Sequence, residues 1–228
     1  SMTDPGHNQV LHRTSRTEFL VVVSLALTAA LSIKIPEFFG FNLSEEEDIF
    51  FYGRNLSFFV LPILTFYFAW KRGALFFALR WLAPAFVAAG VFANIYPFSP
   101  DGATQGLTAL HLPIALWLLV GLAYMGGQWR SGSKRMDFVR FSGELFIYYV
   151  LIALGGVVLT AFMTYIFAII GIDLEWVVTS WILPCSALGA IVIGAWLVET
   201  RQGSINSMAP VLSRVFTPLF STVLLVFL

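Results

Sequence analysis

Six charged or polar side chains interrupt or border long apolar stretches, and they are the residues of this chain that could do chemistry. They are Arg80, Asn94, His111, Glu144, Glu199 and Arg214. Ionisable residues in such surroundings are costly in lipid and usually face a bundle interior or water. A carboxylate there can take a proton or a cation, an arginine can hold a phosphate through two hydrogen bonds, and a histidine can change charge near neutral pH.

The carboxylates and arginines each allow two interpretations. Glu144 opens one apolar stretch, with Arg140 four residues earlier on the same helical face. It is either a proton- or cation-linked carboxylate near a membrane surface or an interfacial residue that pairs with Arg140. Arg80 and Arg214 either extend to the headgroups or close a gate by pairing with a carboxylate on another helix. We expect at least one of these two arginines to pair with Glu144 or Glu199.

His111 and Asn94 lie near the facing ends of two consecutive apolar stretches that a short loop joins. This placement suggests a His–Asn pair at the outer mouth of a bundle, or hydrogen bonds that only pack helices. A lone histidine without neighbouring carboxylates is not a metal site, and we expect neither a metal nor a cofactor.

A leucine–proline pair occurs in three of the apolar stretches, at Pro62, Pro113 and Pro184. An interior proline leaves the carbonyl four residues earlier without its helical partner and can kink the helix. If the three prolines lie at one depth, the freed carbonyls could bind a cation or water in a shared vestibule. Alternatively, the prolines are simply tolerated, as they are in many membrane helices.

The overall composition indicates a membrane protein. Of the 228 residues, 58% are hydrophobic and only 11% are charged, and the mean hydropathy is +0.83. Soluble domains carry about 25% charged residues, so this chain cannot cover a globular surface with charge. The net charge is zero and no basic block indicates a nucleic-acid partner. The single Cys185 excludes an intramolecular disulfide, and the sequence has no HExxH, Walker A or GxSxG motif.

The apolar residues fall into seven stretches, each long enough to cross a bilayer as a helix. They span residues 19–39, 49–70, 74–96, 107–126, 144–171, 176–198 and 211–228. Only helices satisfy the backbone in lipid here, because the alternation of barrel strands is absent. The predicted fold class is therefore an all-α polytopic transmembrane helix bundle of about seven spans, over residues 18–228.

The ends of the chain also carry predictions. Residues 1–17 form a polar tail, in which Ser1 before Met2 has the pattern of a cloning scar. The last apolar stretch reaches Leu228 without a polar flank, so we expect the parent protein to continue. Lys and Arg, apart from Lys34 and Arg54, fall on the side of the N-terminus, whereas the alternate loops are acidic. By the positive-inside rule the N-terminus is cytoplasmic.

Several segments resemble a known family of bacterial membrane proteins. They are LHLPIALW (110–117), RMDFVRFSGE (135–144), YYVLIALGG (148–156), MAPVL (208–212) and RVFTPL (214–219). The chain beyond its first stretch resembles the family catalogued as "domain of unknown function 4153". The resemblance implies a longer multi-pass protein of the bacterial inner membrane. It implies no activity, substrate or site residue.

Three function classes follow from these observations. The first is a transporter or channel for a small solute or ion, which the intramembrane polar residues and prolines favour. The second is a non-transporting accessory, scaffold or sensor subunit, which the lack of a dense polar cluster at midmembrane favours. The third is a membrane enzyme that acts on a lipid-linked substrate. In each case the expected partners are membrane lipids, with a homo-oligomer or a membrane partner protein left open.

Overall fold

The fold is all-helical, as the hydropathy of the sequence predicts. The structure is a computed structural model and describes residues 5–41, 43, 46–98, 102–200, 217, 221 and 225, which form helices and no strand. Within this part of the chain, six helices are long and apolar enough to cross a membrane, and they coincide with the first six predicted stretches. The seventh stretch, 211–228, lies outside the described residues apart from isolated positions, so the predicted count of seven stays a prediction.

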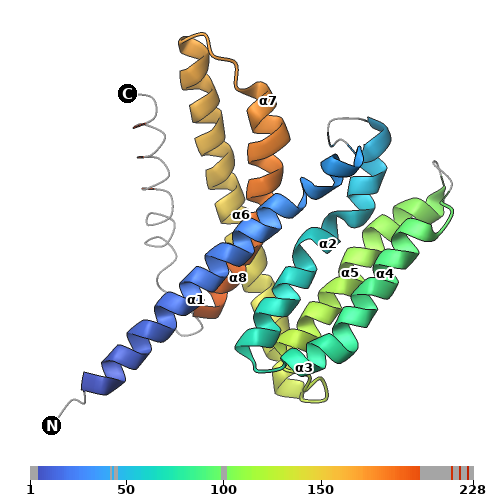
Figure 1. The fold of residues 1–228 in the computed structure, drawn as a ribbon, viewed down its shortest axis with the longest axis vertical. Helices are drawn as coiled ribbons and strands as arrows, with labels where there is room; N and C mark the ends of the chain where they lie inside the picture. Colours follow the sequence, from blue (N-terminus) through green and yellow to red (C-terminus); the bar gives the residue numbers. More distant parts are fainter. Residues whose placement is uncertain are drawn as a thin grey trace.

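The helices follow one another as in Figure 1. The long ones are α1 (Pro5–Ser32), α2 (Glu46–Lys71), α4 (Ala83–Ile95), α5 (Ala103–Tyr124), α6 (Gly132–Ile169) and α8 (Leu183–Thr200). The short ones are the 3₁₀ turn η1 (Ile35–Phe39), then α3 (Leu75–Phe77) with the π-helical turn η2 (Ala78–Leu82), and α7 (Glu175–Val177) with the π-helical turn η3 (Val178–Ile182). Because α1 begins at Pro5, the described part of the polar tail is helical.

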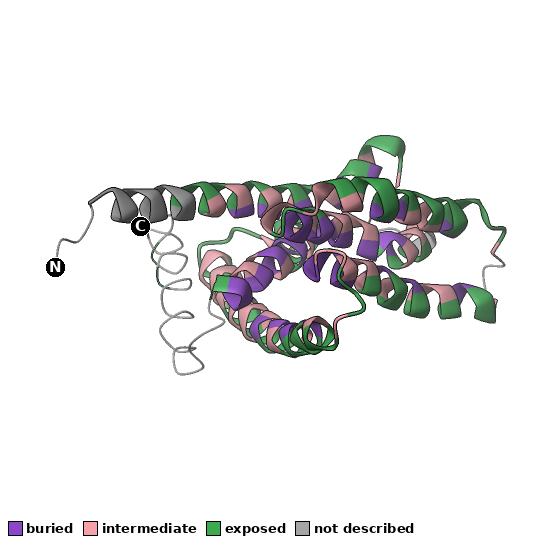
Figure 2. Ribbon diagram, turned by 90° about the horizontal axis from the view of Figure 1, so that it is seen from below, coloured by how far each residue is buried: buried purple, intermediate pink, exposed green. Residues whose placement is uncertain are grey.

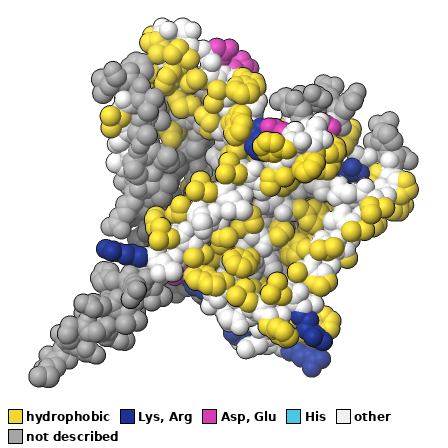
Figure 3. All heavy atoms as spheres, in the orientation of Figure 1, with side chains coloured by type: hydrophobic (Ala, Val, Ile, Leu, Met, Phe, Trp, Pro, Cys, Tyr) yellow, Lys and Arg dark blue, Asp and Glu magenta, His cyan; other side chains and the backbone are white. Residues whose placement is uncertain are grey.

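The long helices run alternately up and down, so their ends gather at two opposite sides of the molecule (Figure 1). We call one side the basic end, where α2 leads into α3 and α5 leads into α6. We call the other the acidic end, where α1 leads into α2 and α6 leads into α7. Figure 3 shows hydrophobic side chains over much of the visible face between these ends, with basic side chains at the lower edge and acidic ones near the top. This distribution suits a body surrounded by lipid.

Helix α2 lies at the centre of the packing and contacts α1, α4, α5 and α8. Helix α8 in turn packs against α1 and α6, and the buried residues lie mostly where the helices meet (Figure 2). The interior is apolar and close-packed; its fully buried side chains include Phe68 on α2, Leu116 on α5, Phe141 on α6 and Val192 on α8. The core therefore connects two groups of helices, α2–α4–α5 and α6–α8, with α1 laid across α8.

Two glycines of α8 allow its neighbours to approach closely. A Cβ atom on Gly189 would lie 3.4 Å from the carbonyl oxygen of Ala26 and 3.6 Å from Cβ of Ala30, both on α1. A Cβ atom on Gly194 would lie 3.1 Å from Leu145 on α6. Small residues are what membrane helices use for such contacts, because packing rather than hydrophobic exclusion holds them together. The contact at Gly194 is the tighter of the two, because a Cβ atom on Gly189 would meet α1 at ordinary van der Waals distance.

Two membrane helices begin with the same local element, which sequence reasoning missed. In both, a three-residue α turn is followed by a five-residue π turn and then by an α-helix with proline at its second residue, Pro84 or Pro184. Each π turn also contains a tryptophan three residues before the proline, Trp81 or Trp181. The two elements point in opposite directions, since α4 starts at the basic end and α8 at the acidic end (Figure 1). π turns interrupt few helices and often mark functional positions.

The three leucine–proline pairs are not equivalent. Pro62 and Pro113 lie within the continuous helices α2 and α5, whereas Pro184 follows a π turn. The proline in the same structural setting as Pro184 is Pro84, which also follows a π turn but is preceded by alanine rather than leucine. Proline is thus accommodated in two different ways along these helices, and the kinks suggested at the three positions stay a prediction. Their convergence on one vestibule stays a prediction.

The orientation in the membrane can be tested by labelling. In a Cys185→Ser background, cysteines at positions 46, 101 and 173 should react with an impermeant thiol reagent in intact cells. A cysteine at position 134 should react only after the membrane is opened. The reason is the charge difference between the loops at the two ends. Labelling at position 134 but not at 46 in intact cells would reverse the predicted orientation.

Candidate functional site

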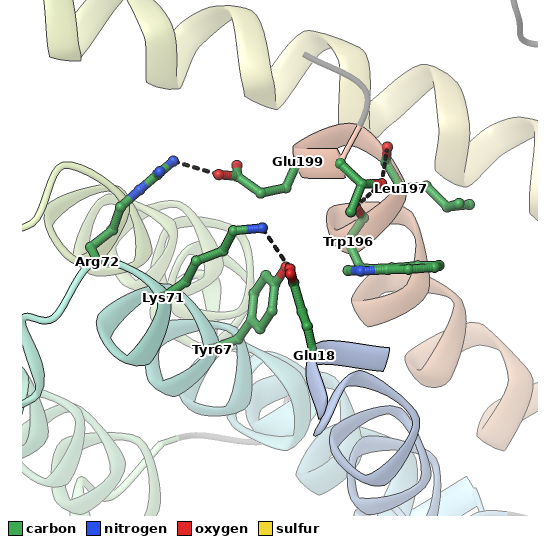
Figure 4. Close-up of polar contacts among 8 residues, drawn as sticks. Glu18, Tyr67, Lys71, Arg72, Trp196, Leu197 and Glu199 are labelled. Atoms are coloured by element: carbon green, nitrogen blue, oxygen red, sulfur yellow. Dashed lines mark hydrogen bonds and ion pairs between the residues drawn. The ribbon is translucent and has the colours of Figure 1, made fainter. Parts of the chain in front are cut away.

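Five polar side chains meet at the basic end, where α1, α2 and α8 come together (Figure 4). We call Glu18, Tyr67, Lys71, Arg72 and Glu199 the charged cluster. Lys71 Nζ lies 2.6 Å from Glu18 Oε1, and the Tyr67 hydroxyl donates a hydrogen bond of 3.3 Å to the same oxygen. These contacts join α2 to α1.

A second ion pair joins α2 to α8. Arg72 Nη2 lies 2.7 Å from Glu199 Oε1, and only 3% of the Glu199 side chain is exposed, against 31% for Arg72. The Arg72 guanidinium also donates from Nε to the carbonyl oxygen of Tyr124 at 3.2 Å, and its Cζ lies 4.9 Å from the centre of the Tyr124 ring. Arg72 is therefore held by α5 as well as α8, and the pair ties together three helices.

One oxygen of this pair is not satisfied. Glu199 Oε2 is buried and has no hydrogen-bond partner among the described residues. A buried carboxylate oxygen without a donor costs free energy, on the order of 1–3 kcal/mol or more for a charged group. A proton, a water molecule or a cation could satisfy it. The arrangement can therefore bind a small positive species beside an existing ion pair.

The sequence of α2 explains why its end carries the cluster. Tyr67 and Lys71 are four residues apart and share the face that meets α1, whereas Arg72 is turned by about 100° toward α5 and α8. The helix ends at Lys71, and Gly73 follows with φ of 65°, a left-handed conformation that glycine adopts without strain. Basic residues in a last helical turn also complement the helix dipole.

Of the residues singled out in the sequence, only Glu199 belongs to the cluster, and its partner differs from the expected one. Arg80 makes no ion pair with either carboxylate in the described part of the chain; its Cζ lies 5.6 Å from the ring centre of the neighbouring Trp81, on the exposed face of η2. Arg214 lies outside the described residues. Glu144 pairs with Arg140, with 3.6 Å between Nε and Oε1, and 34% of its side chain is exposed.

The expectation that Arg80 or Arg214 pairs with Glu144 or Glu199 stays a prediction, because Arg214 lies outside the described residues. Arg80 itself makes no such pair in the described part of the chain. The physical reason is the direction of the side chain: Arg80 shares its turn with the exposed Leu79 and Trp81, so it points away from the bundle. For Glu144, the local pair with Arg140 matches the interfacial interpretation given above.

His111 and Asn94 do not meet. Asn94 exchanges two hydrogen bonds with Asn55 of α2, at 3.0 and 2.9 Å, because this end of α4 packs on α2. His111 Nδ1 lies 2.8 Å from the carbonyl oxygen of Leu107 one turn earlier on α5. His111 also lines a shallow groove of about 420 Å³, whose other walls include Phe92 and Leu112. The suggested His–Asn pair is wrong, and the groove beside His111 is largely apolar.

A buried lysine lies at the acidic end. Lys34, which is 5% exposed, pairs with Glu37 of η1 and sits 4.8 Å from the ring centre of Trp181. Trp181 belongs to η3, the π turn that precedes α8. Helix α8 is thus contacted by a cation near each end, by Lys34 from the end of α1 and by Arg72 from the end of α2.

Sequence reasoning missed Glu18, Lys71, Arg72 and Lys34. A usable signal was present, since these charges directly flank the predicted spans and the Tyr67–Lys71 spacing puts two polar groups on one helical face. Because hydropathy places such residues at span ends or in loops, it offered by itself no reason to expect them in a site.

Comparisons of the chain with protein-family models, with curated proteins and with solved structures found no match. The resemblance to the family "domain of unknown function 4153" thus stays a prediction. What the structure itself establishes is a multi-helix body of which six helices could cross a membrane, with two interhelical ion pairs at its basic end.

Proposed function

We propose that this protein is a transporter or channel for a small solute or ion in the bacterial inner membrane, and that the charged cluster is its gate on the cytoplasmic side. One observation carries the proposal: Glu199 is buried almost completely, pairs with Arg72 at the end of α2 and has one oxygen without a donor among the described residues. An ion pair that joins helix ends at one membrane surface can keep a transport path closed while it is formed and let the path open when it breaks.

Stability alone does not account for such a pair. Removing the Glu199 carboxylate from water costs several kcal/mol, and its attraction to Arg72 often does no more than offset this cost. Ionisable residues inside membrane proteins commonly mark ion pathways, proton relays or gates. Because no described residue donates to Oε2 of Glu199, a proton or cation bound there would compete with Arg72 for the carboxylate and give the pair a second state.

The shape of α8 supports a gate at this place. Its π turn η3 lies at the acidic end, and Glu199 lies about 26 Å farther along the helix at a rise of about 1.5 Å per residue. A tilt of about 10° at η3 would move Glu199 by about 4–5 Å over that length, which exceeds what the 2.7 Å ion pair with Arg72 tolerates. Helix α8 can therefore tilt about η3 at the acidic end, and the ion pair between Arg72 and Glu199 holds its other end in the closed position.

The accessory or scaffold class stays as the second candidate, because the middle of the described core is apolar. The buried hydroxyl of Thr65 donates to the carbonyl of Leu61 in its own helix, and Leu64, Phe68 and Val120 around this depth are apolar and buried. In addition, Arg80, His111 and Glu144 do not share a polar cavity within the described residues. A protein without a path would use its ion pairs only to hold the helices together.

Flux measurements separate the two classes. Purified protein is placed in liposomes, and the passage of monovalent cations, protons and a series of small neutral solutes is followed. Glu199→Gln keeps the size of the side chain but removes the charge that holds Arg72, so it should increase flux at least about tenfold over wild type for one of these species. Glu144→Gln is the matched control and should leave flux unchanged, since the ion pair described for that carboxylate lies along its own helix. If neither wild type nor Glu199→Gln passes any species faster than protein-free liposomes, the scaffold class replaces the transporter class.

A further inference from the structure

The first turns of α6 have a surface that no element of the described chain covers. The helix has 38 residues and is about 57 Å long, against about 30 Å for the hydrocarbon core of a bilayer. Its first three turns start at the basic end, next to the turn that follows α5 (Figure 1). Part of this segment therefore lies at the level of the lipid headgroups.

One face of this segment is buried, and the opposite face carries an apolar strip with an arginine on each side. Phe138 and Phe141 are buried against the bundle, whereas Met136 and Val139 point outward with exposed fractions of 68% and 63%. At about 100° per residue, Arg135 and Arg140 lie on the two sides of this apolar strip. Both arginines are exposed. The outward face thus presents hydrocarbon flanked on each side by a guanidinium.

The charges around this face are mostly positive. Arg130 and Lys134 add to Arg135 and Arg140, and the Arg130 guanidinium lies 5.0 Å from the ring centre of the exposed Trp129. The acidic side chains of this segment are Asp137 and Glu144, and the Arg140–Glu144 pair is long at 3.6 Å with 62% of the Arg140 side chain exposed. An exposed pair of this kind is worth less than about 1 kcal/mol, so Arg140 is available to a stronger acceptor.

The exposed face continues toward the membrane interior beside Gly143. A Cβ atom on Gly143 would have nothing within 4 Å, and the neighbouring Phe146 and Ile147 are 68% and 48% exposed. Gly143 lies one turn after Val139, directly below the arginines in the direction of the bilayer centre. An acyl chain can lie over Gly143 while its headgroup is level with Arg135 and Arg140.

We propose that this face of α6 is a binding site for an anionic phospholipid. The phosphate of the headgroup accepts hydrogen bonds from Arg135 and Arg140, and one acyl chain lies along Met136, Val139 and Gly143. Arginine suits this role because its planar group binds phosphate through two parallel hydrogen bonds. Clusters of basic residues beside a membrane helix attract anionic lipid through the same charges. The site is independent of the charged cluster and of any transport activity.

Lipid binding to the purified full chain in detergent tests the proposal. Phosphatidylglycerol and phosphatidylcholine with identical acyl chains are titrated, and bound lipid is counted by native mass spectrometry. Wild type should bind phosphatidylglycerol at least tenfold more tightly than phosphatidylcholine. Arg135→Gln with Arg140→Gln should remove most of that preference. The matched control, Arg16→Gln with Arg80→Gln, also removes two exposed arginines near the basic end and should keep it.

A third variant tests the part of the site that would hold the acyl chain. Gly143→Leu keeps all charges but fills the place of the acyl chain, so it should weaken phosphatidylglycerol binding several-fold. An equal loss in the control double variant would reduce the preference to general charge attraction and overturn the site. Equal affinity of wild type for the two lipids would overturn it as well. If Gly143→Leu bound phosphatidylglycerol as tightly as wild type, the acyl-chain part of the site would be overturned and only the phosphate contact would stand. Melting temperatures without added lipid show that each variant is folded.

Discussion

Replacing Arg72 with alanine should destabilise the folded protein by about 3–5 kcal/mol, the usual cost of leaving a buried charge without its partner. The Glu199 side chain is 3% exposed and would lose the only ion pair described for it. The variant would also lose the hydrogen bond from Arg72 to the carbonyl of Tyr124. We expect a clear fall in melting temperature in detergent, and a higher yield of unfolded protein at a fixed temperature.

The reverse replacement should cost less. Glu199→Ala leaves Arg72, which is 31% exposed and can turn toward water or headgroups. The double variant should be more stable than Arg72→Ala alone, because it removes the stranded carboxylate, and the double-mutant cycle gives the coupling between the two side chains. Arg80→Ala is the control, since Arg80 is exposed at the same end. Equal losses for Arg72→Ala and Arg80→Ala would show that the ion pair with Glu199 is not formed.

Adding a methyl group at Gly121 should be the most damaging small substitution in the core. A Cβ atom there would lie 2.6, 2.9 and 3.0 Å from three ring atoms of Phe138, far inside normal contact. The ring cannot move away easily, because it packs against Trp117, Tyr124 and Phe141 at centroid distances of 5.7, 5.7 and 6.4 Å. Overpacking of a filled core costs about 1–3 kcal/mol, and we expect Gly121→Ala at the upper end of that range.

Two further variants identify the cause of this loss. Gly143→Ala has open space around its new Cβ atom and should leave the melting temperature in lipid-free detergent nearly unchanged. Phe138→Leu shortens the side chain that Gly121 faces, so it should recover part of the stability when combined with Gly121→Ala. If Gly121→Ala melts like wild type, α5 and α6 do not approach as closely as the structure has them.

The sequence by itself determined that the described chain is helical and roughly where six of its apolar helices lie, but not where α1 and α6 begin or that π turns precede α4 and α8. Hydropathy located six apolar helices, and loop charge divided their ends into a basic and an acidic set, because both properties depend only on residues that are neighbours along the chain. It also picked out Glu199 as an acidic side chain at the edge of a span. The seventh stretch, the orientation and the transport function are predictions that rest on the same local reasoning.

The tertiary structure alone decided which side chains meet. Glu199 pairs with Arg72 rather than Arg80, and Asn94 pairs with Asn55 rather than His111. These choices depend on how each helix is rotated about its axis and on which helix lies beside it. Rotation is set by contacts between residues far apart in sequence, such as Gly194 of α8 against Leu145 of α6. Hydropathy carries no information on rotation when most faces of a helix are apolar, so the partners of the polar residues followed only from the packing.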